Sequence, residues 1–210
     1  MPTNEYLDKL KKRISAANVG SLLKKVARKI KVGDLNSELP VVINGNKINL
    51  VYKPFDKDAN RPEPDVYKNI SKKIIYMNFD KIENKDIAKL LPEIEKKKVI
   101  ICDLRYYPKN TTRFISSLLK ENERRNWMFV PWIMYPDRDS LAGYKEFGWG
   151  MKPYKPHINA KVIFITSSDA ISYAESFMGY IEGYNLATIV GQPTAGTNGN
   201  VNKFSIPGNY

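Results

Sequence analysis

The sequence predicts an α/β fold over residues 73–210, with a largely parallel sheet covered by helices. Two observations predict it: short apolar runs, typical of buried strands, alternate with segments whose apolar residues recur at helical spacing. The strand-like runs span 73–79, 99–104, 127–135, 162–166 and 186–190, and the helical patterns span 84–97, 111–124 and 170–183. Residues 136–160, rich in Gly, Pro and aromatic residues, predict an irregular loop.

Residues 1–53 predict a small α+β unit. Two helical patterns, at 4–14 and 21–31, precede a hairpin over 41–53, in which Asn44-Gly45 supplies the positive φ angles of a tight turn. Residues 54–72 contain three prolines and are interpreted as a linker. We therefore expect a unit over 1–53, a linker over 54–72 and a core over 73–210.

The 210 residues carry a net charge of +12, and residues 1–53 hold 11 basic against 4 acidic side chains. The basic residues within 21–31 indicate a solvated helix face or, as an alternative, a surface for nucleic acid or an anionic membrane. No aromatic residues interleave these lysines, which argues against nucleic acid. No apolar run approaches the ~20 residues of a membrane span, so no transmembrane segment is predicted.

Cysteine and histidine are too scarce for a structural zinc site of the Cys/His type, because the sequence has one of each. Cys102, inside the apolar run at 99–104, is interpreted as a small buried hydrophobe. We expect no metal and no cofactor.

Ser172 is the candidate with the clearest chemistry. In parallel sheets, ligands bind beyond the C-terminal ends of the strands, which is where the loops at 105–110 and 167–172 are expected. A serine at a helix start lies near unsatisfied amides that stabilise an alkoxide or an oxyanion. The pattern Ser172-Tyr-Ala-Glu175 is, however, also a capping box, so the residues alone leave a structural role open.

The stretch Lys161–Gly196 resembles the core of the C-terminal-processing (tail-specific) serine proteases, including their tricorn-like branch. The resemblance is carried by Ser172-Tyr-Ala-Glu175 and by Gly191-Gln-Pro-Thr194-Ala-Gly196 after the next strand. The strand ending in Asp103-Leu-Arg105 is similar as well, and residues 4–18 with the hairpin resemble the later part of a PDZ-like domain. The resemblance implies a ClpP/crotonase-like core with a partial PDZ-like α+β N-terminal segment.

The function implied by this resemblance is hydrolysis of peptide bonds through an acyl-enzyme on Ser172. The backbone amide of Tyr173 would be one oxyanion donor, and the loop after Arg105, represented by Tyr106, would supply the second. The implied partners are peptides or the C-termini of unfolded proteins, not nucleic acid. The resemblance also suggests the bacterial periplasm or cell envelope.

The sequence departs from the family at three places. Thr197 stands where the lysine-dyad branch has its base, and serine needs an activating base. The only histidine, His157, is interpreted as an ordinary loop residue, because the tricorn-like branch places its histidine elsewhere. The loop after Arg105 lacks the family's glycines. The chain is therefore expected to be either a fragment or an inactive peptide-binding homologue, with little protease activity by itself.

Overall fold

The computed structural model describes residues 3–30, 33–54, 65–133 and 140–199 of the chain. Its helices are α1 (Thr3–Arg13), α2 (Val19–Ile30), α3 (Asn84–Ile94), α4 (Thr112–Leu118) and α5 (Tyr173–Gly183). Its strands are β1 (Glu38–Ile43), β2 (Asn46–Val51), β3 (Tyr67–Ser71), β4 (Ile74–Asn78), β5 (Val99–Asp103), β6 (Met128–Ile133), β7 (Leu141–Phe147), β8 (Lys161–Thr166) and β9 (Thr188–Gly191).

A five-stranded sheet with the order β3-β4-β5-β8-β9 forms the centre of the fold. The four strands from β4 to β9 are parallel, and β3 pairs with β4 in the antiparallel direction at one edge. Parallel strands that are covered on a face by helices must be apolar, which is why the sequence pattern identified them. The predicted α/β class with a largely parallel sheet is confirmed.

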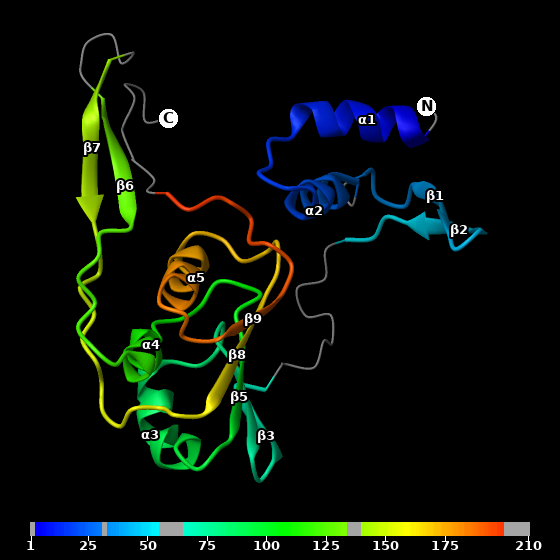
Figure 1. The fold of residues 1–210 in the computed structure, drawn as a ribbon. Helices are drawn as coiled ribbons and strands as arrows, with labels where there is room; N and C mark the ends of the chain where they lie inside the picture. Colours follow the sequence, from blue (N-terminus) through cyan, green and yellow to red (C-terminus); the bar gives the residue numbers. More distant parts are fainter. Residues whose placement is uncertain (1–2, 31–32, 55–64, 134–139, 200–210) are drawn as a thin grey trace.

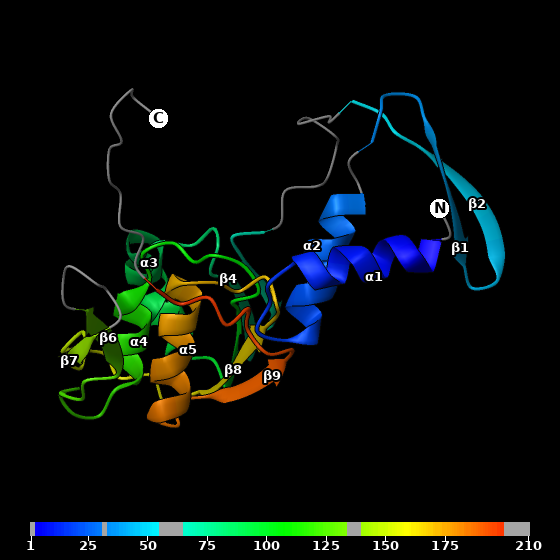
Figure 2. The ribbon, with the colours of Figure 1, turned by 90° about the horizontal axis from the view of Figure 1, so that it is seen from above.

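Helices α3, α4 and α5 lie side by side along one face of this sheet (Figures 1 and 2). Between them and the sheet lies the hydrophobic core, in which Phe79 makes edge-to-face contacts with Phe114 and Phe164 at ring-centroid distances of 5.5 and 5.4 Å. Cys102 is fully buried in this core, and burial raises the pKa of its thiol well above the usual value. The interpretation of Cys102 as a buried hydrophobe is confirmed.

The N-terminal segment contains α1, α2 and the β1–β2 hairpin, which projects away from the sheet (Figure 2). Asn44 and Gly45 connect the two strands with φ angles of 52° and 81°, so the predicted tight turn is confirmed. Hairpin turns of this type follow the natural twist of the strands, and only residues that tolerate positive φ form them readily. The PDZ-like assignment of this segment stays a prediction.

The prediction of an irregular loop over 136–160 is wrong for Leu141–Phe147, which forms β7 and pairs with β6 in a two-stranded sheet, while 136–139 lie outside the described residues. The strand was missed because its seven residues include Gly143, at φ 149°, together with Lys145 and Glu146. Glycine and charged residues have low strand propensity, so the pairing with β6 decides the structure here.

Other boundaries also differ from the sequence pattern. Strand β3 lies inside the stretch interpreted as a linker, where Lys, Asn and Ser gave no strand signal. Helix α4 ends at Leu118, although the helical pattern ran on to residue 124, because Leu119 turns to an extended conformation with ψ 141°. Helices α3 and α5 are likewise shorter than their patterns, at 84–94 and 173–183. The limits of the three predicted units remain a prediction.

Candidate active site

Ser172 lies between β8 and α5, at the C-terminal edge of the parallel strands. It is the N-cap residue of α5, with φ 52° and ψ −109°. Residues other than glycine avoid such angles, which cost about 1–3 kcal/mol unless surrounding contacts impose them. Backbone strain of this kind concentrates at functional sites, so the conformation of the turn supports Ser172 as a candidate functional residue.

The carboxylate of Glu175 holds this strained turn in place. Its Oε2 accepts a hydrogen bond from the backbone N–H of Ser172 at 2.9 Å, as expected for the predicted capping box. The same carboxylate accepts from the backbone N–H of Gly196 at 2.6 Å and of Thr197 at 3.0 Å. One side chain therefore joins the Ser-x-x-Glu motif to the Gly-x-x-Thr-x-Gly motif, which are adjacent in space although separated along the chain.

The proposed oxyanion donors belong to the same edge of the sheet. Tyr173 is the first residue of α5, so its N–H has no acceptor within the helix. The ring of Tyr107 lies 6.1 Å from the ring of Tyr173, which places the loop after β5 beside the helix start. The side chain of Tyr106 is 51% exposed. The assignment of the backbone amides of Tyr173 and Tyr106 as donors stays a prediction.

An ion pair between the buried Asp103 and the exposed Arg105 supports the loop after β5. Asp103 is 4% exposed and accepts hydrogen bonds from Arg105 Nε at 2.9 Å, Arg105 Nη2 at 2.6 Å and the Tyr76 hydroxyl at 2.7 Å. Burial alone would raise the pKa of Asp103, but the hydrogen bonds from Arg105 and Tyr76 outweigh it and lower the pKa. Ser167 Oγ donates to the Arg105 carbonyl at 2.9 Å, so this loop and the loop before Ser172 are connected directly.

We expect Asp103→Asn to lower the free energy of unfolding at pH 7 by about 1–3 kcal/mol, because Arg105 and Tyr76 lose their charged acceptor. The pKa of Asp103 is lowered in the folded state. Its contribution to the free energy of unfolding is therefore complete above its pKa in the unfolded chain, about 3.9, and is lost as the pH falls through its pKa in the folded protein. In urea unfolding between pH 2 and 7, the free energy of unfolding should fall less steeply with acid in the variant than in the wild-type protein. The exposed control Asp65→Asn should keep the wild-type dependence on pH, and the same result for Asp103→Asn would contradict this account.

A pocket of about 430 Å³ opens beside Ser172. Its described lining residues are Tyr107, Met128, Val130, Phe147, Gly148, Trp149, Ser172, Tyr173, Ser176, Asn198 and Gly199. Apolar and aromatic side chains thus form most of the wall, and Ser172, Ser176 and Asn198 supply small polar groups. None of these lining residues is a Lys, His, Asp or Glu that could act as a strong general base.

Glu123 attaches the β6–β7 hairpin to the helix that bears Ser172. Its carboxylate, 2% exposed, accepts from the backbone N–H of Arg125 at 2.6 Å and of Gly150 at 3.0 Å, which lie at the two ends of the hairpin. It also accepts from the hydroxyls of Tyr180 at 3.1 Å and Tyr184 at 2.8 Å. Burial, more than the nearby carboxylate, raises the pKa of Tyr180 to about 12. The hairpin is therefore fixed relative to α5.

The segment around α2 contacts both loops that flank the site. Asn18 Nδ2 donates to the Thr194 carbonyl at 2.6 Å, within the Gly-x-x-Thr-x-Gly segment. Lys24 and Arg28 both pair with Asp169, which lies three residues before Ser172. Two cations of the basic helix therefore neutralise a carboxylate of the same chain.

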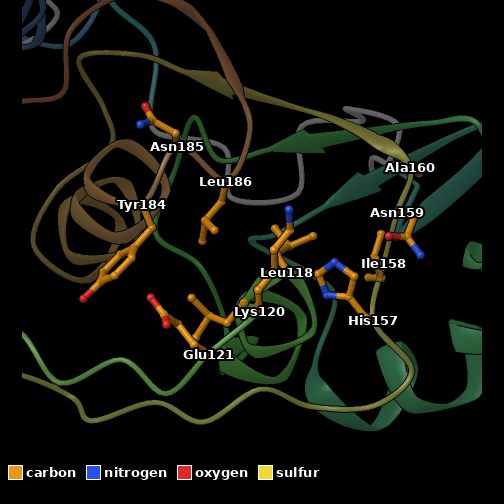
Figure 3. Close-up of a pocket in the computed structure, with 11 residues that line it drawn as sticks. Leu118, Lys120, Glu121, His157, Ile158, Asn159, Ala160, Tyr184, Asn185 and Leu186 are labelled. Atoms are coloured by element: carbon orange, nitrogen blue, oxygen red, sulfur yellow. The ribbon is translucent and has the colours of Figure 1, made fainter.

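His157 lies before the N-terminal end of β8, whereas Ser172 lies beyond its C-terminal end. His157 lines a second pocket, of about 590 Å³, together with Ile158 and Tyr184 (Figure 3). Residues 157–160 precede β8 and Ser172 follows it, and a strand of this length spans about 20 Å. The structure therefore keeps His157 away from Ser172, in agreement with its interpretation as an ordinary loop residue.

Several residues of the site could not be identified from the sequence. The contacts that bring Glu123, Asn18 and Asp169 to the site are made with Tyr180, Thr194 and Lys24, which lie far away along the chain. In the part of the chain that the structure describes, no group of three or more His, Cys, Asp or Glu side chains could hold a metal ion. No helix among the described residues is long and apolar enough to cross a lipid bilayer.

No family model matches this sequence, and no curated protein matches it. Among solved structures, a "putative peptidase" from Parabacteroides merdae aligns with 100% of this chain and 68% of its own, at 13% identity and a TM-score of 0.53. A "putative S41 protease" from Bacteroides fragilis aligns with 81% of this chain and 49% of its own, at 15% identity and a TM-score of 0.38. The tricorn protease aligns with 81% of this chain and 17% of its own, at 16% identity and a TM-score of 0.37.

The likeness to the Parabacteroides structure extends over the whole chain, but its low sequence identity limits the conclusion to the fold. The chain spans about two thirds of that structure and less than half of the other two. Its central mixed sheet and covering helices form an α/β fold shared with a structure described as a peptidase.

Proposed function

We propose that this protein is a serine-type peptidase in which Ser172 is the nucleophile. The observation that carries the proposal is the backbone of Ser172, which is held at φ 52° at a helix start and at the edge of an apolar pocket. The likeness of the fold to a structure described as a peptidase supports the same activity. The sequence resemblance to C-terminal-processing proteases adds the finer proposal that the substrates are peptides or the C-termini of unfolded proteins.

In the proposed reaction, Ser172 Oγ attacks the carbonyl carbon of a peptide bond and passes its proton to a general base. The backbone N–H of Tyr173, with one from the loop at Tyr106, stabilises the negative charge that develops on the carbonyl oxygen. The C–N bond then breaks, the leaving amine takes the proton, and water hydrolyses the ester on Ser172. The described pocket residues do not include this base.

The lack of a general base among the described pocket residues favours a second candidate function, a peptide-binding homologue without catalytic activity. Thr197, where the lysine-dyad branch of the resembled family has lysine, donates its backbone N–H to Glu175 and offers no basic side chain. Both candidates would use the same pocket, so binding alone does not separate them, whereas turnover does.

We expect Ser172→Ala to abolish cleavage of an unstructured test protein, with kcat reduced by at least about 10³-fold, because the acyl-enzyme cannot form. Ser176→Ala is the matched control: Ser176 lines the same pocket one helical turn further on and accepts a hydrogen bond from Asn198 at 3.2 Å. Mass spectrometry of the products measures both. Cleavage that persists in Ser172→Ala would contradict the assignment, and a wild-type protein without cleavage would favour the peptide-binding alternative.

A further inference from the structure

The β6–β7 hairpin contributes three apolar side chains to the wall of the pocket beside Ser172. Met128 and Val130 are two residues apart on β6, so their side chains point to the same face of the strand. Phe147 of β7 is the direct cross-strand partner of Met128 and extends the same apolar surface. Phe129, which lies between Met128 and Val130, does not line the pocket.

This wall is held rigidly relative to Ser172. Trp149, which also lines the pocket, stacks on Tyr180 with a centroid distance of 4.8 Å and donates its backbone N–H to the Tyr180 hydroxyl at 2.8 Å. Tyr180 belongs to α5, the helix that begins after Ser172, and Glu123 binds both ends of the hairpin to that helix. A side chain that enters the pocket would therefore meet a surface whose position relative to Ser172 Oγ is fixed.

The chemistry of the pocket selects for apolar groups. Val130 and Phe147 are each 38% exposed, so apolar surface faces the solvent beside the candidate nucleophile. None of the described residues that line the pocket is charged, so an ionised group in contact with them would lose hydration without gaining a partner among them. The volume of about 430 Å³ falls within the range of about 300–1,000 Å³ that is typical of ligand pockets.

We propose that this pocket binds a large apolar side chain, such as Phe, Leu or Met, of the peptide residue whose carbonyl Ser172 attacks. This inference rests on the proposed function, because it takes Ser172 as the point of attack. The Cβ atom of that residue is two bonds from the attacked carbonyl carbon, so the side chain must lie within a few ångströms of Ser172, and the hairpin wall supplies part of the apolar surface of the pocket there. The hairpin is thus a specificity element.

The test uses the Ser172→Ala variant, so that binding is measured without turnover. Peptides identical except for a C-terminal Phe, Leu, Gly or Asp mimic the acyl product and place that side chain in the pocket. Calorimetric titration, with the tryptophan fluorescence to which Trp149 contributes as a second readout, should give a Kd at least about 10-fold lower for Phe and Leu than for Gly and Asp. Equal affinities for the four peptides, or no binding of any, would overturn the inference.

Two further substitutions in that variant locate the preference. Val130→Asp places a carboxylate in the pocket opposite Lys145 and should remove the preference for Phe. Phe129→Asp places the same charge on the other face of β6 and should leave the preference unchanged. A preference that survives Val130→Asp, or that Phe129→Asp also removes, would contradict the role of the hairpin wall.

Failure of this inference is distinguishable from failure of the proposed function. A serine-reactive probe on the wild-type protein, with its adduct mapped to a residue, tests Ser172, whereas the peptide series tests the pocket. Labelling of Ser172 without any apolar preference would leave the peptidase in place and overturn the subsite. An apolar preference that disappears in Val130→Asp, without labelling of Ser172, would support the subsite in a peptide-binding protein.

Discussion

Replacing Glu175 with alanine is expected to lower the reactivity of Ser172 by at least about 100-fold, because a displacement of about 1 Å at a reacting group has effects of this size. The carboxylate is the acceptor for the backbone N–H groups of Ser172, Gly196 and Thr197. Without it these donors lose a charged acceptor, and nothing equivalent holds the turn at positive φ. The loss should lower the free energy of unfolding by about 2–4 kcal/mol.

Two measurements separate positioning by Glu175 from a general loss of stability. The rate of modification by a fluorophosphonate reports on Ser172, and urea unfolding reports on the whole protein. Glu175→Gln keeps one oxygen acceptor and should recover part of both. Glu182→Gln changes an exposed carboxylate on the same helix and should alter neither. Modification at the wild-type rate in Glu175→Ala would show that the carboxylate does not position Ser172.

Glu123→Ala is expected to lower the free energy of unfolding by about 3–5 kcal/mol, because it leaves two backbone N–H groups and two tyrosine hydroxyls without their buried acceptor. For a chain of this size that corresponds to a melting temperature lower by roughly 10 °C. Differential scanning calorimetry measures the change.

The control for Glu123 is Glu121→Ala, two residues earlier, where the side chain is exposed. It should melt within a degree or two of the wild-type protein, since surface substitutions usually change stability by about 0.5 kcal/mol or less. Because Glu123 also fixes the hairpin to α5, the conservative variant Glu123→Gln should keep the fold and weaken the preference for apolar peptides. Equal melting temperatures for Glu123→Ala and Glu121→Ala would contradict the anchoring role.

The central sheet could be predicted from the sequence because its parallel strands β4, β5 and β8 are buried on at least one face and carry unbroken apolar runs. Runs such as 99–104 and 162–166 identified β5 and β8 almost to the residue. The exposed strands β3 and β7 gave no such signal: they contain Lys, Asn, Glu or Gly, and their pairing with a neighbouring strand fixes them. Helix ends were misplaced for a related reason, since long-range contacts decide where α4 stops.

The candidate site was predictable only where its chemistry is local. Ser172 and Glu175 form a pattern within four residues, and the Gly-x-x-Thr-x-Gly segment was identified by resemblance. The positive φ of Ser172 and the bonds from Glu175 to Gly196 and Thr197 required coordinates. Glu123 and the hairpin wall could not be foreseen, because each acts on residues more than 20 positions away along the chain.

The most direct test of the account is to identify the residue that a fluorophosphonate modifies. The probe's phosphorus forms a bond to an activated serine oxygen and fluoride leaves, so peptide mapping by mass spectrometry locates the nucleophile without knowledge of the substrate. We predict a single adduct on Ser172, absent from Ser172→Ala and present in Ser176→Ala. An adduct on another serine, or a wild-type protein that remains unmodified, would contradict the assignment of Ser172 as an activated nucleophile.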